Sequence, residues 1–296
     1  MSTYRMTFGW QMERFRRSQL DSVNGTTISA DRFYDGTGWT PEELRGQRIL
    51  EVGCGAGRFT EIMVKARAKV VSLDYSDVVR TCRKNTVGKP PQGILQGDLY
   101  HMPFQLRSFD KVFCFGVIQY TPDPELAFKS LLQFLKPGGK LAVDFYRVLP
   151  FPSRWASKYL WRWLTKRLPT SWVFGLVNWY VPKWLPIDNR LNEMRFVWRF
   201  AEYISGIIPC WNYTGAKPLS QAELLDWAVL DTFNSLAPRY DNPLTMETVQ
   251  SWFDEARLVD QTIRYGSNGI LGCARTRESG AQTYRATAHL HPPAAA

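Results

Sequence analysis

The sequence predicts an α/β protein with a doubly wound, mostly parallel sheet. Between Ile49 and Tyr146, five short apolar segments alternate with segments of helical spacing, a pattern typical of parallel β-α-β units. The first apolar segment runs into a glycine-rich turn at Gly53–Gly57, and a helical pattern starts directly after it. Residues 147–244 form a chemically distinct stretch that is far too long for an ordinary connection. This stretch predicts a large, mainly helical insertion after the fifth strand.

The first predicted strand, Ile49–Val52, ends in a turn that contains three glycines. Glycine has no Cβ, so the backbone of such a turn can approach a ligand closely, and the helix that follows completes a cradle for a nucleotide cofactor. A dinucleotide fingerprint would need glycine at position 58 or 60, where this chain has Arg58 and Thr60. The turn therefore does not carry that fingerprint, and a glycine-rich turn alone is more often structural than functional.

The pattern that fits is an acidic residue followed by three alternating glycines, Glu51-x-Gly53-x-Gly55-x-Gly57. In this pattern the chain resembles the class I S-adenosylmethionine-dependent methyltransferases, and within them the type 11 methyltransferase domain. The resemblance implies that S-adenosylmethionine is the cofactor, and that the turn, which includes Cys54, wraps the methionine end while Glu51 faces it. The chemistry agrees, because a sulfonium cofactor without phosphates needs close backbone approach and carboxylates rather than a lysine-and-serine phosphate grip.

Two further strand ends carry acidic side chains. Lys69–Asp74 has the pattern of a buried strand, and Asp74 lies about 20 residues past the glycine turn, where a carboxylate can accept from both ribose hydroxyls. The alternative role for Asp74 is to cap the next helix. Tyr75 follows it and belongs to the expected cofactor site. The third strand ends before Asp98, and the resemblance implies that Asp98 accepts from the adenine amino group while the backbone NH of Leu99 meets the ring.

The fourth predicted strand leads into an exit loop, and Gly116 in this loop completes the expected cofactor site. The family frequently has two histidines where this chain has Gln119 and Tyr120. That departure removes a histidine that is sometimes assigned base or cofactor contacts. The phenol of Tyr120 could hydrogen-bond a substrate, but with an ordinary pKa near ~10 it is a poor base unless it is activated.

The sheet resumes near the C-terminus with a helix and a predicted hairpin, Thr262–Ala274. The resemblance implies that this hairpin completes a seven-stranded, Rossmann-like methyltransferase sheet. The predicted cofactor-binding core therefore comprises residues 46–146 and 245–276. Residues 1–45 precede it as an N-terminal cap segment, and residues 277–296 are expected to form a disordered tail.

The insertion, 147–244, is both aromatic and basic. Residues 147–211 alone hold eight of the twelve tryptophans, and no acidic residue appears in the insertion before Asp188. On a helical wheel, residues 153–168 separate into an apolar and a basic side. The apolar side carries Ala156, Tyr159, Leu160, Trp163 and Leu164, and the basic side carries Arg154, Lys158, Arg162 and Lys166.

The insertion leaves three interpretations open. The apolar run Trp172–Val181 is too short to cross a bilayer and is closed by Pro182 and Pro186. The insertion can be a lid that packs on the core and forms the acceptor pocket. Residues 150–186 can instead make peripheral contact with a membrane, or the aromatics can stack on nucleic acid. Nucleic acid is disfavoured, because the chain lacks the Asn- or Asp-Pro-Pro-Tyr tetrad with which many amino-methyltransferases hold a base.

Composition limits the remaining classes. The net charge of +10 is compatible with a plain basic surface. The five cysteines are scattered without a CxxC pair, which predicts a reducing compartment and no metal site. The sequence has no signal-peptide pattern and no run of ~20 apolar residues. A cytoplasmic location is expected, either free or peripheral to the inner face of a membrane.

These observations predict a methyltransferase that acts on a small-molecule, saccharide or lipid-linked acceptor, with a hydroxyl oxygen as the nucleophile. Such a reaction needs a base only to take the hydroxyl proton. The candidate bases, in falling order, are Asp231, Tyr120 and His101. Two alternatives stay open: methylation at nitrogen or carbon of a natural-product-type molecule, and a membrane-peripheral or interaction protein that keeps the fold without catalysis.

Overall fold

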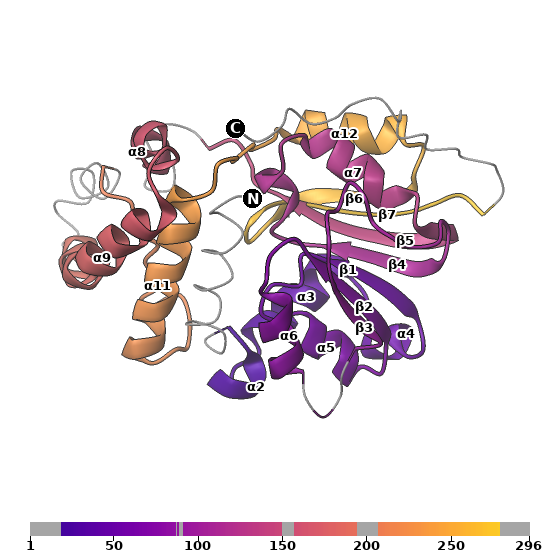
Figure 1. Cartoon of the computed structure of the whole chain (residues 1–296), viewed down its shortest axis with the longest axis horizontal. Helices are drawn as coiled ribbons and strands as arrows, with labels where there is room; N and C mark the ends of the chain where they lie inside the picture. The colour runs from indigo at the N-terminus through magenta and orange to yellow at the C-terminus, as the bar shows by residue number, and fades with distance from the viewer. Residues whose placement is uncertain (1–18, 87, 89–90, 150–156, 194–206, 279–296) are drawn as a thin grey trace.

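A seven-stranded sheet forms the centre of the computed structural model, which describes residues 19–86, 88, 91–149, 157–193 and 207–278 (Figure 1). The strand order is β3-β2-β1-β4-β5-β7-β6. The first five strands are parallel, and β7 and β6 add as an antiparallel pair. The predicted doubly wound, mostly parallel fold is confirmed. The strands are β1 Arg48–Val52, β2 Lys69–Asp74, β3 Gly93–Gln96, β4 Phe109–Cys114, β5 Leu135–Phe145, β6 Val259–Gly266 and β7 Gly269–Arg275.

Helices cover both faces of the sheet, so its central strands are apolar on both sides. Leu50 of β1 belongs to one buried cluster together with Phe128 and Phe253, and its neighbour Ile49 belongs to the opposite cluster together with Met63. The helices of this part are α2 Asp21–Asn24, α3 Ile28–Thr37, α4 Pro41–Leu44, α5 Thr60–Lys65, α6 Val79–Asn85, α7 Pro124–Leu132 and α12 Met246–Glu255.

The predicted hairpin β6–β7 is confirmed, and the first residue of β7 shows why glycine is needed at that position. Gly269 has a φ of +139°, and a Cβ at this position would lie 2.1 Å from the carbonyl oxygen of Phe145. Glycine is the residue that tolerates both this backbone conformation and so close an approach. The hairpin can therefore pair closely with the end of β5.

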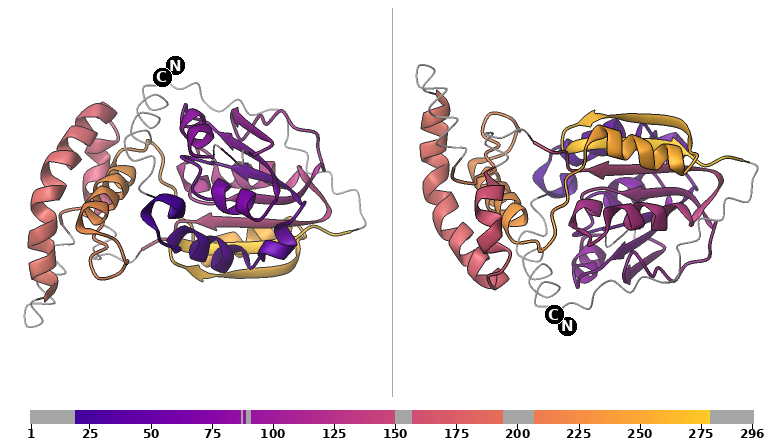
Figure 2. Two further views of the ribbon diagram at one scale, coloured as in Figure 1. Left: turned by 90° about the horizontal axis from the view of Figure 1, so that it is seen from below. Right: turned by 90° about the horizontal axis from the view of Figure 1, so that it is seen from above.

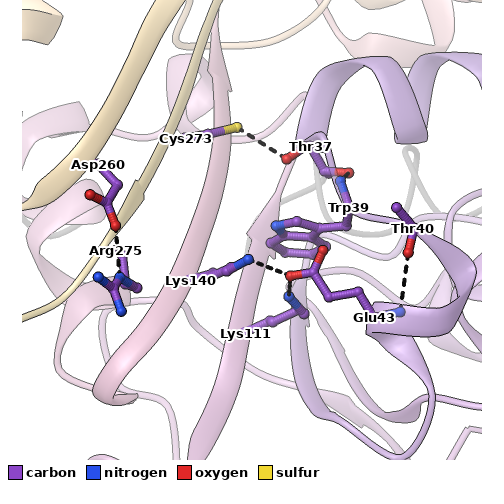
Figure 3. A network of polar contacts seen from close by, with 9 residues as sticks. All are labelled: Thr37, Trp39, Thr40, Glu43, Lys111, Lys140, Asp260, Cys273 and Arg275. Atoms are coloured by element: carbon purple, nitrogen blue, oxygen red, sulfur yellow. Dashed lines mark hydrogen bonds and ion pairs between the residues drawn. The ribbon is translucent and has the colours of Figure 1, made fainter. Parts of the chain in front are cut away.

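A charged cluster joins the N-terminal helix α4 to strands β4 and β5 (Figure 3). Glu43 of α4 accepts from Lys111 of β4 at 2.7 Å and also from Lys140 of β5. The Lys111 ammonium lies 4.6 Å from the centroid of the Trp39 ring. Thr40 caps α4 by accepting from the backbone NH of Glu43. These contacts hold the segment before β1 against the sheet.

The insertion forms a helical layer beside the sheet, with α9 as its outermost helix in all views (Figures 1 and 2). It contains α8 Lys158–Thr165, α9 Thr170–Glu193 and α11 Gln221–Leu236. Helices α9 and α11 share a buried cluster that includes Val177 and Phe233, so the insertion has a core of its own. The capping box of Ser220 and Glu223 is present at the start of α11.

The expectation that Pro182 and Pro186 close the apolar run is wrong. Both prolines lie inside α9, which continues to Glu193. Each proline removes one backbone hydrogen bond. Val181 and Leu185, which directly precede the two prolines, are buried in the cluster that α9 shares with α11. Their packing stabilises the helix around the prolines.

Helix α8 buries its basic side and exposes its apolar side. A lid that packs on the core through its apolar side would need the reverse orientation. The buried residues of α8 are Lys158, Arg162 and Thr165, whereas Trp163 is 60% exposed and its neighbour Leu164 is also exposed. Hydrogen bonds explain the orientation, because Arg162 donates to the carbonyl oxygens of Ser235 and Pro238 at 2.9 Å each. Thr165 likewise donates to the carbonyl oxygen of Leu236. These carbonyls lie at or just past the end of α11 and need donors, and α8 supplies them.

Lys158 adds an ion pair with Asp241 at 2.6 Å, and both groups are nearly fully buried. A buried pair of this kind is expensive to break, because removing either partner leaves an uncompensated charge. The basic side of α8 is therefore fixed inward. Residues 150–156 and 194–206 of the insertion, and most of the predicted C-terminal tail, lie outside the described residues.

Candidate active site

A cavity of about 1230 Å³ lies between the carboxyl ends of the parallel strands and the helical insertion. This is the edge where ligands bind in open α/β sheets. Pockets for one drug-sized ligand measure about 300–1,000 Å³, so this volume has room for two ligands side by side. The strand ends contribute Gly53, Cys54, Gly55, Asp74, Tyr75, Asp98, Leu99 and Gly116, and the insertion contributes Tyr213, Lys217, Trp227 and Asp231 among others.

The glycine turn after β1 has the backbone conformation that its sequence predicts. Gly53, Gly55 and Gly57 have φ values of +83°, +51° and +95°, which residues with a Cβ rarely adopt. Gly53 and Gly55 line the cavity, but Gly57 does not. A Cβ at Gly57 would lie 3.2 Å from the sulfur of Cys82, so this glycine serves the packing of α6 against the turn.

Glu51 lies beneath the glycine turn and is not among the residues that line the cavity. Its Oε2 accepts from the hydroxyls of Thr60 and Ser72, each at 2.6 Å. Its Oε1 is buried without a hydrogen-bond partner among the described residues. Burial raises the pKa of Glu51 to about 7. The structure therefore places this carboxyl group under the turn, in contact with the elements that support it.

Asp74 lines the cavity and also fixes the two turns beside it. Its Oδ2 accepts from the backbone NH of Gly55 at 2.9 Å, and its Oδ1 accepts from the NH and hydroxyl of Ser76. Burial raises the pKa of Asp74 above its ordinary value. Asp74 does not cap the next helix, because α6 begins only at Val79. A carboxylate oxygen can accept two hydrogen bonds, so Oδ2, which accepts one here, keeps capacity for a ligand.

Asp98 and Leu99 lie next to each other on the cavity wall. The Oδ1 of Asp98 accepts from the backbone NH of Tyr100 at 2.9 Å, which orients the carboxyl group. Leu99 is buried in the core. Gly116 also lines the cavity, has a φ of +75°, and donates its NH to Asp144 at 2.5 Å.

Asp231 lies on the cavity wall in the middle of α11. Its Oδ2 accepts from the hydroxyl of Tyr213 at 2.5 Å. Burial raises the pKa of Asp231 above its ordinary value, although the Tyr213 hydrogen bond and the nearby cations Arg58 and Arg32 oppose this rise. Asp231 is thus a carboxylate held by one donor at the insertion side of the cavity.

Tyr120 also lines the cavity, and its hydroxyl lies 2.8 Å from that of Tyr146. Burial raises the pKa of Tyr146 to about 12. The Tyr120 hydroxyl also lies 3.5 Å from the carbonyl oxygen of Asn234, one turn after Asp231 on α11. The structure therefore brings Tyr120 to the same side of the cavity as Asp231.

His101 is the one candidate base that the structure does not bring to this cavity. Its side chain is 74% exposed, and it lies 3.5 Å from Asp98 on the outer surface. It is not among the cavity-lining residues. A general base must come within hydrogen-bond reach of the proton that it removes. His101 therefore lies out of the reach that a base acting in this cavity requires.

Comparisons with known proteins agree with this geometry. Residues 50–143 match a family model described as a methyltransferase domain. A ubiquinone biosynthesis O-methyltransferase of Xanthomonas euvesicatoria pv. vesicatoria (strain 85-10) is 34% identical over 105 residues, which are 34% of this chain and 44% of that protein. A protein of the same name from Coxiella burnetii (strain Dugway 5J108-111) is 31% identical over 100 residues, 33% of this chain and 43% of its own.

Residues 50–143, about a third of the chain, are thus similar to a methyltransferase domain. The chain spans less than half the length of the two curated relatives that it matches. A solved S-adenosylmethionine-dependent methyltransferase from Mesorhizobium loti has 27% sequence identity and a TM-score of 0.33 over 36% of this chain and 50% of its own.

Two charged groups beside the cavity are not evident from the sequence patterns. Asp144, near the end of β5, is almost fully buried and pairs with Arg32 of α3 at 2.9 Å. Its signal in the sequence is an acidic residue near a strand end, the same as for Asp74. Arg32 lines the cavity from the N-terminal segment, and only the folded chain brings it there.

Proposed function

We propose that this chain is an S-adenosylmethionine-dependent methyltransferase that methylates a hydroxyl oxygen of a small-molecule, saccharide or lipid-linked acceptor. One observation carries the proposal: a single cavity of about 1230 Å³ joins the glycine turn, Asp74 and Asp98 to Asp231. A methyltransferase needs adjacent places for cofactor and acceptor, and this cavity provides space for both. The name of the matched relatives, O-methyltransferases, supports oxygen as the nucleophile.

The residues at the strand ends fit S-adenosylmethionine. Gly53 and Gly55 expose backbone to the cavity without a Cβ. Asp74 and Asp98 keep acceptor capacity for ribose hydroxyls and for an adenine amino group. Cys54, Tyr75, Leu99 and Gly116 complete this wall, while Glu51 and Gly57 support it from beneath. When bound there, the cofactor supplies an electrophilic methyl group on a sulfonium.

The side chains of the insertion would act on the acceptor. Transfer to oxygen is an in-line displacement, so holding the acceptor hydroxyl in position can supply much of the rate. Asp231 would accept the hydroxyl proton as the oxygen attacks, with Tyr213 holding the carboxylate in place. Tyr120 would orient the acceptor through its hydroxyl, which is hydrogen-bonded to the hydroxyl of Tyr146.

A methyl-transfer assay tests this proposal. Purified protein is incubated with S-adenosylmethionine and a panel of phenolic, catechol and sugar acceptors, and production of S-adenosylhomocysteine is measured. We expect turnover with at least one acceptor and a loss of about 10²–10⁴ in kcat/KM for Asp231→Asn. The matched control is Asp226→Asn, because Asp226 is exposed on the same helix and does not line the cavity. Cofactor binding without turnover of any acceptor would favour the non-catalytic alternative.

The pH profile separates a base from a positioning residue. The raised pKa of Asp231 means that its carboxyl group takes up a proton at a higher pH than an ordinary aspartate would. The kcat/KM of the wild type should therefore fall on the acid side as Asp231 becomes protonated. Asp231→Asn should lack this limb. A variant with the same acid limb as the wild type would contradict the assignment of Asp231 as the base.

A second proposal concerns peripheral contact with the inner face of a membrane from the cytoplasmic side, through the described part of residues 150–186. The reversed orientation of α8 favours it, because Trp161 and Trp163 are exposed there, and Trp172 and Trp179 are exposed on α9. Tryptophan is enriched at the boundary between lipid and water. None of the described helices is long and apolar enough to span a membrane, so the contact would be interfacial.

A further inference from the structure

Two basic side chains lie against the same tryptophan ring on the wall of the cavity. The guanidinium carbon of Arg58 is 5.3 Å from the centroid of the Trp227 ring, and the ammonium of Lys217 is 4.9 Å from it. Arg58 directly follows the glycine turn, whereas Lys217 and Trp227 belong to the insertion. All three residues line the cavity. The pair therefore spans the boundary between the methyltransferase sheet and the insertion.

Among the described residues, neither Arg58 nor Lys217 has an ion-pair partner within 4.0 Å. Arg58 donates to the hydroxyl of Ser29 at 2.8 Å, which satisfies one donor but supplies no charge. The other cavity cations with a similar degree of enclosure are compensated: Arg32 pairs with Asp144, and Lys158 pairs with Asp241. The contrast identifies Arg58 and Lys217 as cations that are free to receive an anion from the cavity.

The electrostatics of the cavity wall also favour an anion beside Arg58 and Lys217. Burial and the charge of Arg32 lower the pKa of Arg58 to about 10. Burial, Arg58 and Arg32 lower the pKa of Lys217. The cations thus repel one another, and the charge of Asp231, whose Oδ2 accepts from Tyr213, offsets this repulsion only in part, with Asp21 adding to the offset at Arg58. A partly buried cation without a partner is unfavourable, and an anion bound from the cavity would relieve that cost.

We propose that the acceptor carries a carboxylate or phosphate group, which binds between Lys217 and Arg58 beside Trp227. This inference rests on the proposed methyl transfer and names the class of its acceptor. Trp227 and Asp231 are four residues apart on α11, so they lie on the same side of the helix, and both line the cavity. An anion held at Lys217 would place the body of the acceptor near the Asp231 carboxylate. Guanidinium and ammonium groups suit carboxylate and phosphate alike.

The test uses small aromatic anions in place of the unidentified acceptor. Benzoate, phenyl phosphate and the neutral benzamide are titrated into the full chain saturated with S-adenosylhomocysteine. We expect benzoate or phenyl phosphate to bind more tightly than benzamide, and Lys217→Gln to weaken binding of the anion at least tenfold without changing that of benzamide. Lys217→Arg, which keeps the charge, should retain most of the anion binding.

Lys183→Gln is the matched control. The ammonium of Lys183 lies 4.0 Å from the centroid of the Trp179 ring, in the same type of contact, but outside the cavity. We therefore expect Lys183→Gln to leave benzoate binding unchanged. An equal loss in Lys183→Gln and Lys217→Gln, or equal binding of benzoate and benzamide to the wild type, would overturn the proposal.

A second comparison separates the acceptor from the cofactor as the source of the anion. S-adenosylhomocysteine carries a carboxylate, whereas 5′-methylthioadenosine lacks it. We expect Lys217→Gln to bind both as the wild type does. If the variant loses affinity for S-adenosylhomocysteine alone, the anion at Lys217 is the carboxylate of the cofactor, and the proposal is wrong. Failure of the wild type to bind S-adenosylhomocysteine would instead contradict the proposed function itself.

Discussion

At the scale of a single residue, Glu51 belongs to the glycine-turn motif but supports the fold beneath the cavity instead of lining it. Its carboxyl group is buried under the glycine turn, and burial raises its pKa to about 7 from an ordinary 4.5. Between these two pH values the folded protein keeps a proton that the unfolded chain has released. The free energy of unfolding therefore falls as pH rises through this window, and the full cost, on the order of 3 kcal/mol, is present only above the folded pKa.

Glu51→Gln should remove this pH dependence, because an amide does not ionise. We expect the stability of the variant relative to the wild type to increase between pH 4.5 and pH 8. Urea denaturation of both proteins at the two pH values measures this difference, and other titrating groups cancel in the comparison. A difference that is the same at both pH values would show that Glu51 has an ordinary pKa in the folded protein.

Residue spacing predicted the acidic residues at the strand ends well. Asp74 could be placed by its distance from the glycine turn and Asp98 by the family resemblance, and the two lie at the same edge because one ends β2 and the other lies just past the end of β3. Spacing could not reveal that Asp74 also binds the NH of Gly55, since this contact depends on the conformation of the turn. His101 was predicted from residue type alone, and residue type does not say on which side of a turn a side chain lies.

At the scale of the element, helical periodicity could not predict which side of α8 is buried. The wheel separates an apolar from a basic side, but it does not say which side is buried. The carbonyl groups of Ser235, Leu236 and Pro238 decide it, because they accept hydrogen bonds from the polar side of α8. Those acceptors lie about 70 residues further along the chain, at or just past the end of another helix.

This orientation makes the exposed tryptophans testable as a membrane-contact surface. We expect the wild type to sediment with vesicles that contain phosphatidylglycerol, and the triple variant Trp163→Ser, Trp172→Ser, Trp179→Ser to bind at least tenfold more weakly. The variant should remain folded, because these side chains are 60%, 69% and 62% exposed. High salt should also weaken binding if the exposed Lys166 and Arg167 face anionic lipid.

Leu106→Ser provides the control, because Leu106 is similarly exposed, at 57%, but lies in a loop outside the insertion. This variant should sediment as the wild type does. Wild-type protein that stays in the supernatant, or a triple variant that sediments equally well, would leave the aromatic face of the insertion without a role at a membrane.

At the scale of the whole molecule, the cavity depends on parts of the chain that are far apart in sequence. Asp74 and Asp231 both line it, although one follows the second strand and the other lies in the insertion. The sequence predicted the sheet, the glycine turn and an insertion after the fifth strand. It left open whether the insertion would stand beside the carboxyl ends of the strands, because that placement depends on contacts between distant residues, such as the hydrogen bond from the side-chain amide of Asn242 to the carbonyl oxygen of Thr121.

Calorimetric titration of S-adenosylmethionine into the wild type and Asp74→Asn tests the central claim most directly. We expect the wild type to bind and Asp74→Asn to bind at least tenfold more weakly, because the substitution removes a carboxylate from the cavity wall. Asp77→Asn is the matched control, since Asp77 is exposed three residues further on, does not line the cavity, and should leave the affinity unchanged. A wild type that does not bind, or an Asp74→Asn variant with wild-type affinity, would contradict the account.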